Sequence, residues 1–342
     1  MSTTIDLEGR LLRPAPPERF GPAELDGLPE PVRRHLAQAI APGTPLATAA
    51  RLWMRGAIKV GHWLPFRARQ VLSPHHGFVW TARAAGLIAG GDRYLEGAGA
   101  MEWKLAGLVT VAAGGGPDVS RSAAGRAGAE GVWLPTALLP RFGVRWSAQA
   151  DDEVTAAFEV GETPVELHLR LDGVGRVTSL AFDRWGDPDG DGFRWHRFGG
   201  EITGHASFGG LTIPSAGRLG WHPGEDRFTD GEFFRYRITE LQPVGPAGAG
   251  RGGRRVAEGG GLDAVELGVL AAAGQQLGVA AHLDQAGPVQ DHDQVGHPHR
   301  REPVRHQQGD GAAGAGGGGV ALEQGMLGLG VQGGGGLVQD QQ

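Results

Sequence analysis

Cysteine is absent from the 342 residues of this chain. Its absence excludes disulfide bonds, catalytic thiolates and sites in which cysteine holds zinc or an iron–sulfur cluster. Lysine is almost as scarce, because Lys59 and Lys104 are the only two. The formal net charge is -6, so the chain lacks the basic stripe of a nucleic-acid binder, and we expect no nucleic-acid partner.

Long hydrophobic runs are also missing. No segment approaches the roughly 20 consecutive apolar residues that span a bilayer. The first residues lack the basic stretch followed by an apolar stretch that is typical of a signal peptide. We therefore expect a cytoplasmic protein without a transmembrane segment.

Aromatic residues stop well before the end of the chain. All 9 Trp, 12 Phe and 2 Tyr precede residue 245, and the remainder is rich in Gly and Gln. Such a segment cannot bury enough apolar surface to offset chain entropy, so we expect disorder. A frameshift or antisense read-through would produce a similar composition. We predict a flexible arm over residues 1–20, a β-rich domain over 21–244 and a disordered tail over 245–342.

From Arg51 onward, apolar side chains recur at every second position. The clearest case is Val165, Leu167, Leu169 and Leu171, which alternate with polar residues, as in an antiparallel sheet with one covered face. Helices are predicted at "LPEPVRRHLAQAI" and in the Ala-rich run that follows "GGGP", where Asp118 or Ser120 could provide the N-cap. This pattern predicts a mainly β (α+β) fold: one large curved antiparallel sheet, a half-open β-barrel packed on one or two helices, with a sandwich as second choice.

Several short stretches in order along residues 28–242 resemble one known family. They are "GFVWTAR", "GPDVSRSAAGR", "VWLPTALLP", "RWGDPDG", "FGGLTIP" and "GEFFR". The chain resembles an uncharacterised bacterial domain-of-unknown-function family, the 6544/6920 group, and this resemblance implies no activity. The architecture also resembles the periplasmic lipoprotein carriers, whose half-barrel closes on a helix and holds acyl chains. That second resemblance implies no transferable site.

The segment "GDPDGDGFRW" places Asp187, Asp189 and Asp191 at alternate positions before Gly192, like the first half of a calcium-binding EF-hand loop. The bidentate Glu is missing at position 12 of the loop, and the flanking residues alternate as strands do. We therefore predict a tight turn between two strands. Histidines elsewhere have no metal-site spacing, and compositional bias accounts for the His-rich tract of the tail, with His292, His297, His299 and His306. We expect no metal and no cofactor.

Acidic residues offer an alternative, enzymatic interpretation. Asp92, Glu102 and Asp183 would form a catalytic site of a hydrolase-like enzyme if they met in a cleft. Equally, Asp92 can belong to a turn and Glu102 to the rim of the sheet, where charges discourage edge pairing. No nucleophile motif accompanies them, so we assign no catalytic residue.

Large aromatic residues are the most suggestive feature of the folded part. They fill cores first, but a curved sheet can leave an apolar concavity, which is the usual form of a binding site. Arginines are interleaved with them, namely Arg67, Arg69, Arg83, Arg184 and Arg194. We expect a non-enzymatic binder of an apolar or amphipathic small molecule, such as a lipid or fatty acid. The alternatives are the enzyme above or a structural, partner-binding module with an exposed sheet edge. The predicted ligand-binding residues are Trp63, Phe66, Trp80, Arg83, Tyr94, Trp103, Trp133 and Trp185.

Overall fold

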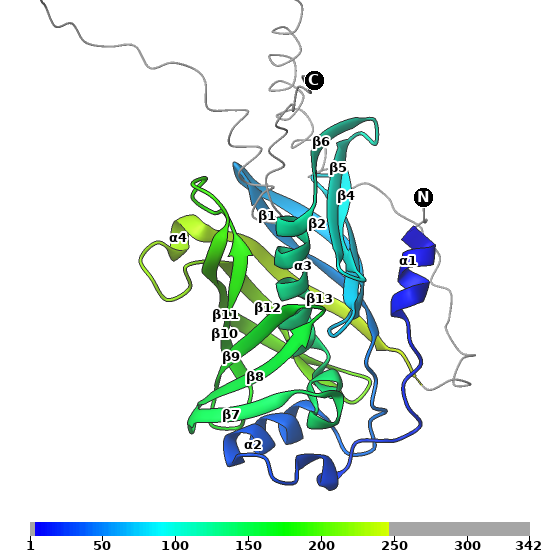
Figure 1. Ribbon diagram of the computed structural model, residues 1–342, viewed down its shortest axis with the longest axis vertical. Coiled ribbons are helices and arrows are strands. Elements are labelled where there is room, and N and C mark those ends of the chain that lie inside the picture. The colour runs from blue at the N-terminus through cyan, green and yellow to red at the C-terminus, as the bar shows by residue number, and fades with distance from the viewer. Residues whose placement is uncertain (1–3, 246–342) are drawn as a thin grey trace, which may run out of the picture. The chain divides into compact units, whose positions relative to one another are not determined.

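In the computed structural model, residues 4–245 are described, and their strands form one antiparallel sheet that does not close (Figure 1). The sheet has thirteen strands in the order β6-β5-β4-β3-β2-β1-β13-β12-β11-β10-β9-β8-β7. The strands are β1 (Ala50–Val60), β2 (His62–Ser73), β3 (Gly77–Ala84), β4 (Ile88–Leu95), β5 (Ala98–Leu105), β6 (Val109–Gly115), β7 (Arg145–Ala150), β8 (Glu153–Val160), β9 (Thr163–Leu171), β10 (Val177–Gly186), β11 (Arg194–Phe208), β12 (Leu211–Trp221) and β13 (Glu232–Pro243).

Two runs of neighbouring strands make up this sheet. The strands β1–β6 follow one another as hairpins, and so do β7–β13, with tight turns such as Glu96-Gly97, where both residues have positive φ (51° and 82°). The first and last strands, β1 and β13, pair antiparallel and join the two runs in the middle of the sheet. The predicted fold, a large curved antiparallel sheet in a half-open barrel, is confirmed.

Helix α3 (Pro117–Ala129) connects the two runs and lies in the hollow of the sheet, where it contacts strands of both (Figure 1). Small residues allow this close approach: a Cβ at Gly128 would lie only 2.7 Å from Val165 Cγ2. The predicted N-cap is wrong, because the helix begins at Pro117, whose fixed φ suits the first turn. Ser120 Oγ instead donates to the Gly116 carbonyl (2.8 Å) and accepts from the Gly99 amide (2.9 Å).

Further helices cover the ends and the outer face of the sheet. The predicted helix α2 (Glu30–Ala39) is present and packs its buried Val32 and Leu36 against the β7, β8 and β12 region. Within the segment expected as an arm, α1 (Thr4–Leu11) lies on the outer face of β2 and β3, with Leu11 fully buried. The remaining pieces are η1 (Pro22–Leu25), η2 (Glu130–Trp133), η3 (Pro135–Leu138), η4 (Pro140–Phe142) and α4 (Phe228–Gly231).

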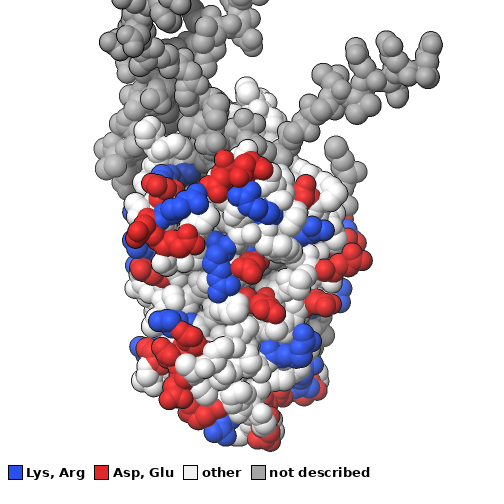
Figure 2. Space-filling model, turned by 60° about the vertical axis from the view of Figure 1, so that its left-hand side comes forward, with Lys and Arg blue, Asp and Glu red and all other residues white. Residues whose placement is uncertain are grey.

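One large apolar core fills the space between the concave face of the sheet and α3. The alternating residues Val165, Leu167, Leu169 and Leu171 all point into it, as predicted. Over the face drawn in Figure 2, acidic and basic side chains are intermixed on the outer surface. Among the residues that the structure describes, no helix is long and apolar enough to cross a membrane. The predictions about the tail concern residues that lie outside the described range.

Candidate functional site

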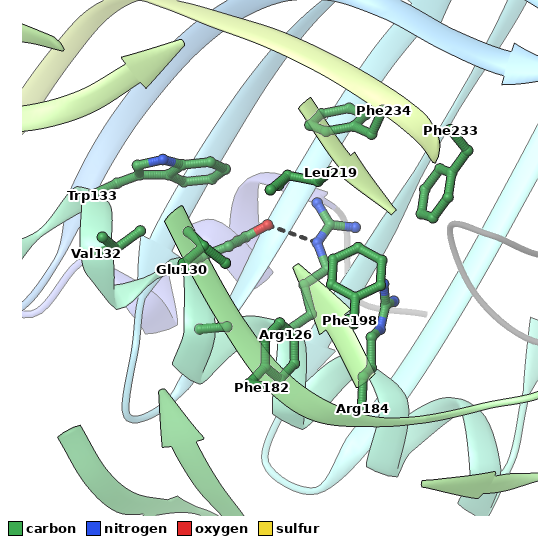
Figure 3. A pocket seen from close by; sticks show the side chains of 12 residues that line it. Arg126, Glu130, Val132, Trp133, Phe182, Arg184, Phe198, Leu219, Phe233 and Phe234 are labelled. Carbon is green, nitrogen blue, oxygen red and sulfur yellow. Dashed lines mark hydrogen bonds and ion pairs between the residues drawn. The ribbon is translucent and has the colours of Figure 1, made fainter. Parts of the chain in front are cut away.

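A cavity of about 560 Å³, counted out to its open mouth, lies between α3 and the inner face of β10–β13. This volume includes space that is open to solvent, and the space for the centres of water-sized molecules is about 50 Å³. The end of α3 and the following 3-10 turn form one wall, and inward-pointing residues of the four strands form the other (Figure 3). The cavity is lined by Arg126, Ala129, Glu130, Val132, Trp133, Leu180, Phe182, Arg184, Phe198, Leu219, Phe233 and Phe234.

Aromatic rings form most of the apolar wall. Phe198 packs edge-on against Phe182, with 5.5 Å between ring centroids, and makes a tilted contact with Phe233 at 5.8 Å. Phe182 and Phe198 are cross-strand partners on β10 and β11, so the sheet register itself brings them together. On the far side, Phe234 stacks on Phe66 of β2 at 5.2 Å. The cavity therefore lies at the edge of the aromatic core and is open on one side.

A buried network of charges lies next to the aromatic wall. The Arg126 guanidinium donates to Asp92 Oδ2 through Nη1 and to Glu130 Oε1 through Nε, both at 2.7 Å. Gln70 donates its side-chain amide to the other oxygen of Glu130, and Trp103 Nε1 donates to Asp92 at 3.4 Å. Each charge in this network thus has an opposite charge or a hydrogen-bond donor as its partner.

Burial and pairing act in opposite directions on the ionisation of this network. Asp92 is only 5% exposed, and its burial raises the pKa of the carboxyl above the ordinary value, although Arg126 opposes the shift. Burial alone would lower the pKa of Arg126, but Glu130 and Asp92 more than offset this and raise it. Arg126 therefore stays charged and holds the two carboxylates.

Arg184 differs from Arg126 because it has no carboxylate partner among residues 4–245. Its side chain is 3% exposed, lines the cavity, and donates from Nε to Ser122 Oγ at 3.2 Å. Within residues 4–245, no other hydrogen-bond acceptor and no ion-pair partner contacts its guanidinium. The group packs instead on the faces of Phe198 (4.9 Å) and Trp221 (5.5 Å). Burial, together with the charge of Arg126, lowers the pKa of Arg184 to about 9, so it is still a cation at neutral pH.

A family model now accounts for most of the folded part. The model of a family of unknown function, DUF6544, matches residues 18–233. The chain belongs to this family. This finding confirms the family resemblance read from the short motifs. No curated protein matches the chain.

Solved structures with some similarity to this DUF6544 domain share little sequence with it. One is a putative outer membrane lipoprotein-sorting protein domain from Vibrio parahaemolyticus, with 9% identity and a TM-score of 0.35, covering 63% of this chain and 91% of that one. Another is a LolA superfamily protein from Nitrosomonas europaea, with 9% identity and a TM-score of 0.34, covering 62% and 91%.

The predicted binding residues of the DUF6544 domain are divided between the two faces of the sheet. Trp133 lines the cavity, and Phe66 and Trp80 lie directly behind it, packed against Phe234. Tyr94 and Trp103 are buried further along the same concave core. All five therefore belong to one hydrophobic core, and of these five only Trp133 borders the open space.

The other three predicted residues lie away from the cavity. Trp63 and Arg83 occupy alternate positions that point to the outer face, where Arg235 stacks on Trp63 and Arg83 is exposed. Trp185 donates to Asp118 on α3 (2.7 Å) and packs on Trp195. Of the interleaved arginines, Arg184 enters the cavity. Arg67 is exposed, and Arg69 and Arg194 pair with Glu8 and Asp191.

The three carboxylates of the enzymatic alternative do not meet. Asp92 points inward to Arg126, whereas Glu102 pairs with Lys104 and Asp183 pairs with Arg197 on the exposed surface. That candidate catalytic site is therefore wrong, because alternate strand positions send these side chains to opposite faces. The aspartate-rich segment forms the predicted turn between β10 and β11, where Asp187 accepts the Gly192 amide at 3.1 Å.

Cavity residues that the sequence did not single out come mainly from the second run of strands. Phe182 and Phe198 occupy the same face as Leu180 and Arg184, and the alternation along β10 and β11 would have grouped them. Arg126 and Glu130 are four residues apart in a helix, which is the spacing of an ion pair. No signal in the sequence could have shown that this helix turn faces those strands.

Proposed function

We propose that this DUF6544 domain is a non-enzymatic binder of an amphipathic small molecule with an apolar body and an acidic head, such as a fatty acid. The observation that carries the proposal is Arg184, a buried cation in an apolar cavity that has no carboxylate partner in the described part of the chain. A buried charge is costly unless it is paired and hydrogen-bonded. An anionic ligand would supply the missing partner.

The chemistry of the guanidinium favours a carboxylate or phosphate head. Arginine presents its N–H groups as a planar fork, which matches two oxygens of such an anion. Stacking on Phe198 and Trp221 holds the plane of the guanidinium, while its Nη groups have no acceptor among the residues that the structure describes. The neighbouring Arg126 adds positive potential, although Asp92 and Glu130 already neutralise it locally.

The apolar body of the ligand would lie against the aromatic wall. Phe182, Phe198, Phe233, Phe234 and Trp133 present rings to the cavity, and few polar atoms interrupt them (Figure 3). Sites of this kind bind through buried apolar area and use a small number of polar groups to fix orientation. The sequence-based alternative of a partner-binding module has weaker support, since the two edge strands are short, with seven residues in β6 and six in β7.

Binding of dodecanoate tests the proposal. Calorimetric titration below the micelle concentration should give saturable binding of dodecanoate, and clearly weaker binding of dodecanol, which has the same apolar body without the charge. Arg184→Met should weaken dodecanoate binding by roughly 10–100-fold, because a charge-assisted hydrogen-bonded pair contributes about 1.5–3 kcal/mol. Affinity for dodecanol should change little in this variant.

A matched control separates this site from general surface charge. Arg83→Met removes an exposed arginine of the outer face and should leave dodecanoate binding unchanged. The proposal is wrong if dodecanol binds as tightly as dodecanoate, or if the two arginine variants bind dodecanoate equally well.

A further inference from the structure

Three metal-ligating side chains meet at one end of strands β10–β12. Asp189 lies in the turn between β10 and β11, His196 is on β11, and His222 follows the last residue of β12. One ligand atom from each, a carboxylate oxygen and two imidazole nitrogens, lies within 4.8 Å of the others. Neither histidine belongs to the cavity described above.

Backbone pairing fixes the two histidines as neighbours. The β11–β12 register ends at Phe198 and Trp221, and the His222 amide then donates to the Arg197 carbonyl at 2.9 Å. Trp221 packs edge-on against the His196 ring at 6.0 Å, and the rings of His196 and His222 are also 6.0 Å apart. The two imidazoles are thus held side by side by the sheet, while Asp189 approaches from the turn.

One nitrogen of each imidazole, Nε2, is buried without a hydrogen-bond partner in the described part of the chain. His196 is 8% exposed, and the Nε2 atoms of both His196 and His222 have no hydrogen-bond partner within the described part of the chain. A buried polar nitrogen without a partner costs about 1–3 kcal/mol, and two such atoms next to each other are uncommon in a native structure. A bound ion would give both nitrogens an acceptor for their lone pairs.

We propose that Asp189, His196 and His222 bind a divalent first-row transition-metal ion, for which Zn²⁺ is the representative. Imidazole nitrogen suits Zn²⁺, Ni²⁺ and Cu²⁺, whereas Ca²⁺ and Mg²⁺ take oxygen ligands. Two histidines and one carboxylate leave a position for water or a further ligand. In a tetrahedral site with metal–ligand distances of about 2.0–2.1 Å, ligand atoms are about 3.3 Å apart. The three ligand atoms, which lie within 4.8 Å of one another, therefore need to move closer together when the ion binds.

The present partners of Asp189 can give way to the ion. Its carboxylate pairs with Arg227 and, at 3.8 Å, with Arg194, and these arginine side chains are 57% and 48% exposed. Exposed ion pairs contribute about 0–1 kcal/mol, so releasing them costs little. His222 Nδ1 lies 3.9 Å from Glu225 Oε2, which adds a second carboxylate near the site and favours a cation there.

Metal titration of the full chain tests the site. Zn²⁺ binding is followed by calorimetry, and Co²⁺ binding by its visible absorption, which reports coordination geometry. His196→Gln and His222→Gln should each bind one equivalent less Zn²⁺ than the natural chain and lose the Co²⁺ band. Asp189→Asn should weaken binding at least tenfold, because it removes the only charged ligand of the proposed site, and loss of even an outer-shell partner typically costs about 10–100-fold.

Two controls make the outcome decisive. His62→Gln removes an exposed histidine of β2, and a variant with glutamine at positions 292, 297, 299 and 306 removes the His-rich tract of the tail. Both controls should keep the Co²⁺ band. If His196→Gln fails to fold, as judged by circular dichroism, His222→Gln and Asp189→Asn carry the test. Unchanged Zn²⁺ stoichiometry in the His222→Gln variant, or loss of all binding in the tail variant, would overturn the proposal.

Discussion

Replacing Arg126 with methionine is expected to lower the free energy of unfolding by about 3–5 kcal/mol, because it leaves a buried charge without its partner. Arg126 holds Asp92 and Glu130, and all three side chains are at most 12% exposed. Methionine fills a similar volume, so little of the lost stability would come from a cavity. Most of it would come from the unpaired Asp92 carboxylate. Urea unfolding, followed by tryptophan fluorescence, measures the change.

A second substitution distinguishes the two causes. Asp92→Asn in the Arg126→Met background removes the stranded charge, and the double variant should be more stable than Arg126→Met alone by over about 1 kcal/mol. Arg170→Met, which breaks the exposed pair with Glu153, should cost less than about 1 kcal/mol. If the double variant were as unstable as Arg126→Met, stacking of the Arg126 guanidinium on Phe78 would be the main contribution.

The pH dependence of stability gives a further expectation for Asp92. Its pKa is raised in the folded state, so the folded protein holds the proton more tightly than the unfolded chain does. This contribution to stability is fully present below the unfolded pKa and is lost as the pH rises through the raised folded pKa. Asp92→Asn should therefore flatten the fall in stability from acidic towards neutral pH, as measured by urea unfolding at a series of pH values.

Local patterns were sufficient to predict the kind of fold. Alternation such as that of Val165 to Leu171 depends only on neighbouring residues, and so does the apolar stripe with Val32 and Leu36 on helix α2. β1 and β13 are the first and last strands of the sheet in chain order, so the residues that pair between them are far apart in the sequence. No local pattern indicated this pairing. The N-terminal helix α1 was also missed, because its apolar contacts Val71, Val79 and Leu95 come from distant strands.

The site was less predictable than the fold, for a related reason. Aromatic content indicated an apolar concavity, but which face of each strand becomes concave depends on the curvature of the whole sheet. Trp63 and Arg83 therefore lie outside, while Trp133 and Arg184 lie at the cavity. Similarly, His196 near the start of β11 and His222 just after the end of β12 lie close together because these two strands pair antiparallel. The two histidines are too far apart in the sequence to resemble a metal-binding motif.

Phe234→Ala is expected to destabilise the domain by about 3–5 kcal/mol, the usual cost of removing a buried phenylalanine ring. Phe234 packs on Phe66, Trp80 and Tyr236, with ring centroids 5.2, 6.4 and 6.0 Å away, and it also borders the cavity. The ring therefore contributes to stability and limits the size of the ligand. Urea unfolding measures the first effect.

Ligand selectivity measures the second effect and links the core to the proposed function. The space left by the Phe234 ring would join the cavity, so the variant should gain affinity for hexadecanoate relative to dodecanoate. Phe158→Ala provides the matched control, because Phe158 is equally buried on β8 but does not line the cavity. Phe158→Ala should lose a similar amount of stability, but its ratio of hexadecanoate affinity to dodecanoate affinity should not change. Equal shifts of that ratio in both variants would mean that a general loosening of the core, and not the shape of this cavity, determines which ligand binds.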